Sequence, residues 1–320
     1  MIIFGATTAT YRLKQMLESE GKHIEAFCDN DPLKQGKECL GLPIIKPTEL
    51  NEKSEVMISS LWSQTIANQI KALGVTKIST ADRYEFPLHF DHKMDFTKIG
   101  ELYNMLEDNL SKETLRMIVN YRLSLSEIGF SFYDQYFCPN ALPFGTLIDG
   151  GAFTGDTAVR FLKYCEKIFA FEPVKSVYDS LVQETKGLNK VIPKNYALYD
   201  KNGTASISNI DLPGASNLST VSETANESEG TDIINTIRLD DCIDEKIDVL
   251  KLDIEGSEKE ALIGATSLIQ KYKPRLHICL YHKPADLYDL PLFIKTLNPE
   301  YKFYLGHHSE NITESVLYAL

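Results

Sequence analysis

Short apolar runs alternate with amphipathic and polar stretches along the second half of the chain. Three of these runs end in an acidic residue, namely Asp149, Glu172 and Asp253, and a fourth, over 273–282, ends in His282. Runs of strand length that alternate with helical patterns are typical of a parallel sheet. Because ligands bind at the carboxyl ends of the strands in open α/β sheets, these polar ends are expected to border a ligand cleft.

The first half shows the same alternation on a smaller scale, and apolar residues between 102 and 123 then recur at helical spacing. The chain is therefore expected to hold a small Rossmann-like α/β domain over 1–95, a helical connector over 96–140 and a larger α/β domain over 141–320. The strands predicted in the small domain cover 1–4, 24–29, 42–45, 56–59 and 77–79, with a helix across 64–73.

A glycine-rich turn follows the apolar run that ends at Asp149, and Glu172 lies 21 residues after Gly151. In nucleotide-binding sheets such glycines let the backbone approach the ligand, and an acid about 20 residues on accepts hydrogen bonds from ribose hydroxyls. A pyrophosphate would be held at the first helix N-terminus, but here Asp149 and Asp156 surround the turn. The turn therefore favours a cationic, phosphate-free ligand, and S-adenosylmethionine is the candidate. The alternative is a glycine-rich turn of another kind of α/β protein.

Several spaced motifs resemble the FkbM family of S-adenosylmethionine-dependent methyltransferases. They are Asp-Gly-Gly-Ala-x-x-Gly-Asp from Asp149, Phe-Glu-Pro around Glu172, Leu-Asp-Ile-Glu-Gly-x-Glu around Asp253 with a following Gly-Ala, Lys-Pro, and a late Tyr-x-x-Tyr-x-x-His. The resemblance covers the chain from about Asp134 to the C-terminus, although Phe153 stands where many methyltransferases have a glycine. It implies a class I methyltransferase sheet of seven strands and O-methylation, commonly of a sugar or polyketide hydroxyl.

The first 95 residues resemble the small Rossmann-like domain found ahead of sugar-modifying transferases. In that domain the first turn usually reads Gly-Ala-Gly, but here Thr7 replaces the second glycine and Thr10 a later one. A side chain at these positions obstructs close approach of a phosphate to the backbone. We therefore expect this domain to serve oligomer contacts, as in a homo-oligomer, or substrate docking, rather than nucleotide binding.

The resemblance and the strand pattern together suggest which residues hold the cofactor. Glu172 is expected to hold the ribose, and Asp149 the amino end of the cofactor, directly or through water. Gly150 and Gly151 form the turn that lets the backbone approach, and Ala197 is expected to border the adenine. Tyr136, in an arm before the first strand, either covers the methionine end of the cofactor or anchors the arm in the core.

An alcohol is a poor nucleophile until it loses its proton, so a general base or a metal is expected. His282 is the first candidate because the reference pKa of histidine lies near neutrality. Asp253 is the alternative base, or orients the acceptor, while Glu255 and Glu258 complete an acidic patch. The alternative hypothesis, which we do not favour, is that this patch binds Mg²⁺. His277 is expected in the core, and at most one of His307 and His308 reaches the cleft because adjacent strand residues face opposite sides.

The composition of the chain disfavours some classes of binding partner and some cellular locations. The net charge of −12 disfavours nucleic acid and anionic membrane surfaces as partners. Apolar runs stay below bilayer-spanning length, the start lacks a signal-peptide pattern, and the six cysteines are scattered, which together favour a cytoplasmic protein. The Ser- and Thr-rich stretch 211–230 is expected to form a loop in which Ser216 and Asn217 could bind an acceptor hydroxyl.

The function expected is therefore S-adenosylmethionine-dependent O-methylation of a small-molecule or glycan acceptor, such as a sugar precursor. One alternative is a binding or scaffold subunit that kept the fold and lost activity. The joint presence of Asp149, Gly151, Glu172, Asp253 and Glu255 argues against it. The other alternative is a nicotinamide-dependent oxidoreductase, which would require a Gly-x-Gly turn that neither glycine region supplies.

Overall fold

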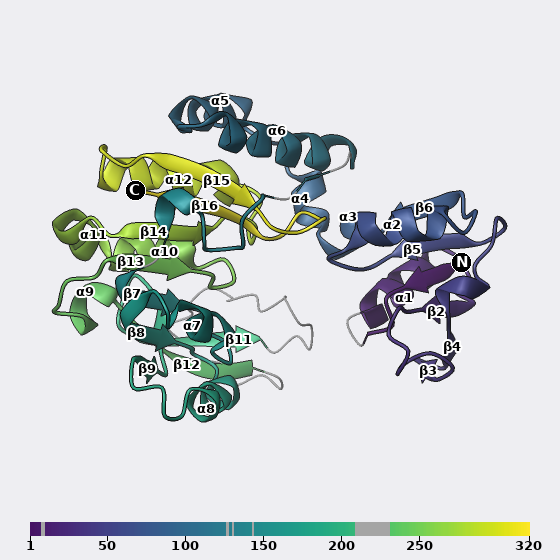
Figure 1. The fold of residues 1–320 in the computed structure, drawn as a ribbon, viewed down its shortest axis with the longest axis horizontal. Helices are drawn as coiled ribbons and strands as arrows, with labels where there is room; N and C mark the ends of the chain where they lie inside the picture. The colour runs from purple at the N-terminus through teal and green to yellow at the C-terminus, as the bar shows by residue number, and fades with distance from the viewer. Residues whose placement is uncertain (8–9, 126–127, 130, 143, 209–230) are drawn as a thin grey trace. The chain divides into compact units, whose positions relative to one another are not determined.

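The computed structural model describes residues 1–7, 10–125, 128–129, 131–142, 144–208 and 231–320 (Figure 1). They form two compact units. Unit 1 comprises Met1–Lys93, Arg116–Phe130 and Ser309–Thr313, and unit 2 comprises Met94–Leu115, Ser131–His308 and Glu314–Leu320. The predicted connector is thus divided between the units rather than forming one of its own. The predicted loop with Ser216 and Asn217 lies outside the described residues.

Unit 1 holds a sheet of six strands in the order β3-β4-β2-β1-β5-β6, and all neighbours are parallel except β3 and β4. Ile2 belongs to one core cluster and Ile3 to another, as expected for a strand covered on both faces. The predicted strands are confirmed, while the short β3 was missed. The strands are β1 (Ile2–Phe4), β2 (Ala26–Cys28), β3 (Glu38–Cys39), β4 (Leu42–Ile45), β5 (Glu55–Ile58) and β6 (Lys77–Thr80).

The missed strand depends on a tight turn. Leu40 and Gly41 connect β3 to β4, and both have positive φ angles, of 52° and 76°. Two consecutive positive φ angles are what a two-residue hairpin requires, but leucine is rare at such a position. The sequence Leu-Gly therefore gave no turn signal. The helices of unit 1 are α1 (Thr10–Ser19), α2 (Ser63–Lys71), α3 (Asp82–Glu85) and α4 (Pro87–Asp91), and α6 (Asn109–Ser124) runs across the boundary between the units.

Unit 2 contains the seven-stranded sheet that was predicted, in the order β15-β16-β14-β13-β7-β8-β9 (Figure 1). The five strands from β14 to β9 are parallel, and β16 is antiparallel to β14 and β15. The strands are β7 (Gly145–Gly150), β8 (Cys165–Phe171), β9 (Val191–Lys194), β13 (Val249–Leu252), β14 (Arg275–Cys279), β15 (Phe303–His307) and β16 (Ser315–Ala319).

The order of these strands places a topological switch point between β7 and β13. From β7 the chain moves outward to β8 and β9 and then returns to the other side of β7 as β13. Ligands of open α/β sheets bind at the carboxyl ends of the strands beside such a point. The residues that follow β7 and β13 are therefore where a site is expected.

Unit 2 also holds a separate sheet in the order β10-β12-β11, in which β11 and β12 are antiparallel and lie on either side of the stretch 211–230 in the sequence. In the described ranges no helix has both the length and the apolarity that a bilayer crossing requires. The remaining elements are α5 (Phe96–Met105), α7 (Asp156–Phe161), α8 (Lys175–Glu184), β10 (Ala197–Leu198), β11 (Gly203–Ser208), β12 (Thr231–Ile237), α9 (Leu239–Cys242), α10 (Glu258–Gly264), α11 (Thr266–Tyr272) and α12 (Asp286–Leu297).

Candidate active site

The glycine turn after β7 is shaped by its neighbour in the sheet. Gly151 has a φ of +72°, and a Cβ at this position would lie 1.8 Å from the carbonyl oxygen of Asp253. A Cβ on Gly150 would lie 2.9 Å from the Leu252 side chain. Glycine is thus required because the chain after β13 passes against the turn. The expected reason, close approach of a ligand, is not needed to explain these two glycines.

A buried lysine, which the sequence analysis did not single out, connects the two strands at the switch point. Lys251 on β13 is the register partner of Asp149 on β7, and its ammonium lies 2.9 Å from the Asp149 carboxylate. The ammonium also donates to the carbonyl oxygens of Gly150 and Gly151 at 3.1 and 2.8 Å. Lys251 therefore fixes the turn through three contacts. The signal was a single lysine inside an otherwise apolar strand.

Asp149 lies deeper than expected. Its side chain is fully buried, and burial raises the pKa of its carboxyl although Lys251 opposes the shift. Within the described part of the chain, its Oδ2 has no hydrogen-bond partner. No surface of this carboxylate is exposed. The expected contact with the amino end of a cofactor, directly or through water, remains a prediction.

Glu172 follows β8 directly, as predicted, and its side chain is largely buried. One carboxylate oxygen accepts the Val174 backbone N–H at 2.9 Å. Burial raises the pKa of this carboxyl to about 7. Asn195 supports the turn by donating to the backbone oxygen of Glu172 at 2.9 Å. Ala197 is buried on β10, and its expected place beside an adenine stays a prediction.

Asp253, Glu255, Glu258 and His282 come together as predicted, and we call them the acidic cluster. His282 Nδ1 lies 2.8 Å from Glu258 Oε1, and His282 Nε2 lies 3.4 Å from Asp253 Oδ1 and 3.6 Å from Glu255 Oε2. Glu258 is fully buried at the start of α10 and also accepts the Ile254 N–H at 2.9 Å. The imidazole is thus surrounded by three carboxylates.

This surround overturns the reason for choosing His282 as the base. Burial alone would lower the pKa of His282, but Glu258, Asp253 and Glu255 outweigh it and raise the pKa to about 10. Near neutral pH the ring is therefore an imidazolium, which has no lone pair to accept a proton. The reference pKa of histidine misled because the number of adjacent carboxylates could not be counted from the sequence.

Two tyrosines hold Asp253. Tyr136 donates its hydroxyl to Asp253 Oδ2 at 2.7 Å, and Tyr281 donates to Oδ1 at 2.9 Å. Burial alone would raise the pKa of Asp253, but Lys251, His282 and the two hydroxyls lower it. Tyr136 is itself buried, and its backbone N–H donates to the Tyr318 hydroxyl at 3.0 Å. These contacts hold the arm against the sheet, and the other expected role of Tyr136, covering the methionine end of the cofactor, stays a prediction.

A further carboxylate at this edge was missed. Glu314, which precedes β16, accepts a hydrogen bond from Gln135 Nε2 at 2.5 Å. Burial, reinforced by the charge of Asp253, raises its pKa to about 7. No pattern marked Glu314 because it lies 61 residues beyond Asp253 in the sequence. Only the antiparallel pairing of β16 with β14 brings it to this edge.

Backbone strain gathers around the same edge. Tyr136, Phe153, Glu255 and Glu314 all have left-handed φ angles, between 48° and 68°. Such conformations are costly for residues with side chains and persist at functional sites, where the surrounding structure enforces them. The strain therefore points to the turn, the acidic cluster and Glu314 as one site.

The other histidines take structural positions. His277 is fully buried, as predicted, and burial lowers its pKa to about 3. His307 is also buried and shares a hydrogen bond of 2.8 Å with Ser315. His308 Nε2 lies 3.3 Å from the Tyr318 hydroxyl. Across the described residues, no group of three His, Cys, Asp or Glu side chains has a geometry that could hold a metal ion.

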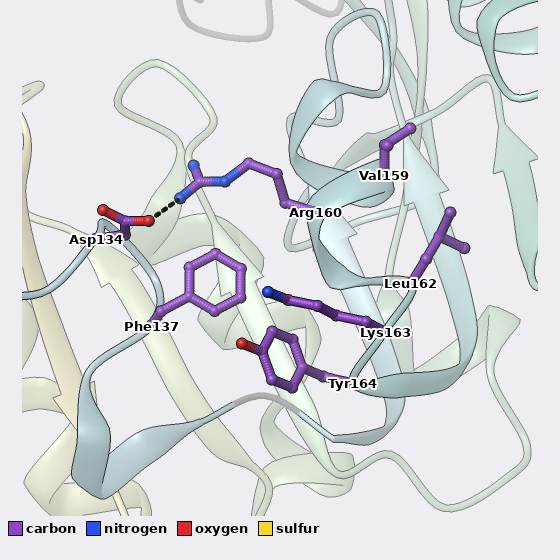
Figure 2. Close-up of a pocket in the computed structure, with 7 residues that line it drawn as sticks. All are labelled: Asp134, Phe137, Val159, Arg160, Leu162, Lys163 and Tyr164. Carbon is purple, nitrogen blue, oxygen red and sulfur yellow. Dashed lines mark ion pairs between the residues drawn. The ribbon is translucent and has the colours of Figure 1, made fainter.

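A second feature of unit 2 is a surface hollow of about 420 Å³ (Figure 2). It is bordered by the arm that carries Tyr136 and by the end of α7. None of the residues predicted to bind cofactor or to act in catalysis lines it. The lining residues are Asp134, Phe137, Val159, Arg160, Leu162, Lys163 and Tyr164.

Comparisons with known proteins agree with this geometry. The family model described as the methyltransferase FkbM domain matches residues 149–303, and the model C2185-like, N-terminal, matches residues 1–79. A crystal structure of the methyltransferase FkbM from Methylobacillus flagellatus KT has a TM-score of 0.69 and 21% identity, covering 100% of this chain and 89% of that one. That likeness shows the fold.

A curated relative is the hexuronic acid methyltransferase AglP of Haloferax volcanii, which is 34% identical over 110 residues. The aligned part covers 32% of this chain and 43% of the relative, so less than half of the relative is matched. The matched FkbM model begins at Asp149 and includes Glu172 and the whole acidic cluster. The second half of the chain therefore contains a domain that matches the FkbM methyltransferase family model.

Proposed function

We propose that the chain transfers a methyl group from S-adenosylmethionine to a hydroxyl of a sugar or glycan precursor. The observation that carries the proposal is an excess of negative charge at the switch point. The described residues there include two buried cations, Lys251 and His282, and six carboxylates. The carboxylates are those of Asp149, Glu172, Asp253, Glu255, Glu258 and Glu314.

This edge fits the cofactor. Bound S-adenosylmethionine would supply a methyl group on a positively charged sulfur, together with an ammonium group. Burial disfavours the ionised form of carboxylates such as Glu172 and Glu314, whose pKa values are raised. A positive charge or a hydroxyl donor bound beside them would stabilise that ionised form. Glu172 would hold the ribose hydroxyls, because its place after β8 is where nucleotide-binding sheets carry such an acid.

Methylation of an alcohol releases a proton, which a group of this chain has to accept. His282 is already protonated near neutral pH, and Asp253 has a lowered pKa and two tyrosine hydroxyls on its oxygens. Glu255 has a pKa raised by burial, its side chain is about one-third exposed, and its contact with His282 is long at 3.6 Å. We therefore assign proton acceptance to Glu255, positioning of the acceptor to Asp253, and positioning of both carboxylates to His282.

The acceptor class rests on the relative. A protein named as a hexuronic acid methyltransferase matches part of this chain, which supports a sugar hydroxyl as acceptor. Asp253 and Glu255 can accept hydrogen bonds from hydroxyls, which sugars offer in number. A hydroxyl-rich acceptor is therefore the first class to screen.

Calorimetric titration of the purified chain with S-adenosylhomocysteine tests the cofactor assignment. We expect micromolar binding that Glu172→Ala weakens about 10- to 100-fold, the loss typical of hydrogen bonds to a charged group. Asp29→Ala in unit 1 is the matched control and should leave the affinity unchanged. The titration is repeated with Mg²⁺ added and chelated, and with NAD. Absence of binding to either cofactor would favour the scaffold alternative.

The proton acceptor is tested by methyl transfer to a panel of sugar acids and glycosides, using S-adenosylmethionine with a radioactive methyl group. Glu255→Gln is expected to slow turnover about 10²- to 10⁴-fold, the usual contribution of a general base, with S-adenosylhomocysteine affinity retained. Glu300→Gln, at an exposed ion pair with Lys273, is the control. If Glu314→Gln slowed turnover more than Glu255→Gln, the role would move to Glu314.

A further inference from the structure

The hollow beside α7 has aromatic walls. The rings of Phe137 and Tyr164 lie with centroids 5.3 Å apart and are tilted by 45° (Figure 2). The Arg160 guanidinium lies 4.8 Å from the centroid of the Phe137 ring, and the Lys163 ammonium lies 4.8 Å from that of the Tyr164 ring. Each cation is thus held against an aromatic face. The hollow combines two rings with two positioned positive charges.

The charge of these two cations is poorly compensated by the protein. Asp134 approaches Arg160 to 3.6 Å, which is too long for a hydrogen bond, and the Asp134 side chain is 84% exposed. An exposed pair of this kind contributes little. Lys163 has no ion-pair partner among the described residues. Two cations with a single long ion pair between them stand out in a chain whose net charge is −12.

Arg160 donates no hydrogen bond to another described residue, so its N–H groups are available to a ligand. These groups lie in one plane and match the paired oxygens of a carboxylate or a phosphate. The aromatic walls offer apolar surface to the rest of a ligand. A hollow of about 420 Å³ lies within the size range of small-molecule sites.

From these observations we infer that the hollow binds an anionic sugar, a pyranose ring that carries a carboxylate or a phosphate. Arg160 and Lys163 bind the anionic group, and Phe137 and Tyr164 pack against the ring. Nucleic acid is disfavoured because two cations are too few to offset the repulsion from a chain of this charge.

The same arm connects the hollow to the candidate active site. Asp134 and Phe137 line the hollow, while Gln135 and Tyr136 between them contact Glu314 and Asp253. A glycan bound in the hollow would therefore order the segment that holds Asp253. The statement that this sugar belongs to the methyl acceptor rests on the proposed function, whereas anion binding in the hollow does not.

Titration of the 320-residue chain with four probes tests the inference: trigalacturonic acid, glucose 6-phosphate, neutral maltotriose and inorganic phosphate. Binding of either anionic sugar, with maltotriose and phosphate at least tenfold weaker, is expected, and the tighter of the two identifies the anionic group. Equal binding of phosphate would mean a simple anion site, and equal binding of maltotriose a neutral one. Either result would overturn the inference.

Variants place the binding in the hollow. The double variant Arg160→Gln/Lys163→Gln should weaken anionic sugar binding at least tenfold. Lys175→Gln/Lys186→Gln removes the same charge at and after α8 and should leave binding intact. Equal loss in both pairs would refute the placement. S-adenosylhomocysteine affinity, measured on the same samples, reports folding and separates the two proposals, because retained cofactor binding without sugar binding defeats this inference alone.

Discussion

The six-stranded sheet of unit 1 and the seven-stranded sheet of unit 2 each have an acidic residue directly after their second strand in chain order. The surroundings of these two acids differ. Asp29 follows β2 in unit 1 and Glu172 follows β8 in unit 2. The Asp29 carboxylate accepts the N–H groups of Ala6 and Asp31 at 3.0 and 2.9 Å, and Lys34 lies 2.9 Å away. Glu172 accepts the Val174 N–H at 2.9 Å, and burial outweighs the backbone hydrogen bonds from Val174 and Phe153 in shifting its pKa.

The pKa values of the two acids express this difference. Burial alone would raise the pKa of Asp29, but the Asp31 N–H, Lys34 and the Ala6 N–H outweigh it and the pKa is lowered. The pKa of Glu172 is raised to about 7. In unit 1 hydrogen bonds and a lysine satisfy the acid after the second strand, whereas in unit 2 burial dominates. The expectation that unit 1 does not bind a nucleotide stays a prediction.

The lysines that pair with Asp149 in unit 2 and with Asp29 in unit 1 provide the largest predicted effect. Lys251→Met leaves Asp149 buried without its counter-ion and is expected to lower the free energy of unfolding by about 3–5 kcal/mol. Lys34→Met removes a partner whose side chain is 37% exposed and should cost at most about 1 kcal/mol. Urea unfolding followed by circular dichroism measures both.

The single tryptophan makes the measurement selective. Trp62 lies in unit 1, so its fluorescence follows that unit while circular dichroism follows the whole chain. We expect Lys251→Met to shift the dichroism transition and leave the Trp62 transition in place. Similar losses for the two lysine variants would mean that the ion pairs are equivalent and would remove the basis of the comparison.

A second prediction concerns stability against pH. The folded-state pKa of Glu172 lies above its unfolded value of about 4.5, so ionisation destabilises the fold as pH rises from 4.5 through 7. At pH 8 Glu172→Gln should therefore raise the free energy of unfolding by up to about 3 kcal/mol, from about 1.4 kcal/mol per pKa unit. Asp29, with a lowered pKa, stabilises the fold above its unfolded pKa, and this contribution is lost as pH falls.

The matched variant tests the opposite sign. Asp29→Asn should lower stability at pH 8 by about 1–2 kcal/mol, because an amide replaces an acceptor that serves two N–H groups and a lysine. Thermal unfolding at pH 8 and pH 5 measures both variants. A Glu172→Gln protein that is less stable than the parent at pH 8 would show that Glu172 is satisfied within the fold.

Whether a feature of this protein could be predicted from the sequence depends on how far apart its interacting residues lie in the chain. The run from Val249 to Leu252, the turn at Gly151 and the acid at Glu172 are local patterns, so the strands and the edge of the sheet were predictable. The protonation of His282 was not, because it depends on the burial of three carboxylates from another segment, 253–258, and on their distances from the ring. Lys251 and Glu314 were missed because their roles arise only from the pairing of β13 with β7 and of β16 with β14.

The smallest predicted effect sharpens the comparison most directly, because it concerns the ligand. Ribose hydroxyls donate to an ionised carboxylate, so binding should favour the charged form of Glu172, whose pKa in the free protein is about 7. The affinity for S-adenosylhomocysteine is then expected to fall about tenfold from pH 8 to pH 6, and binding at pH 7 should release protons. Calorimetry in buffers of different ionisation enthalpy measures both. Glu172→Gln should abolish the slope while Asp29→Asn keeps it. If the affinity of Glu172→Gln still depended on pH, the titration would belong to another acid of the site, such as Glu314. The contrast between Asp29 and Glu172 would then not explain ligand binding.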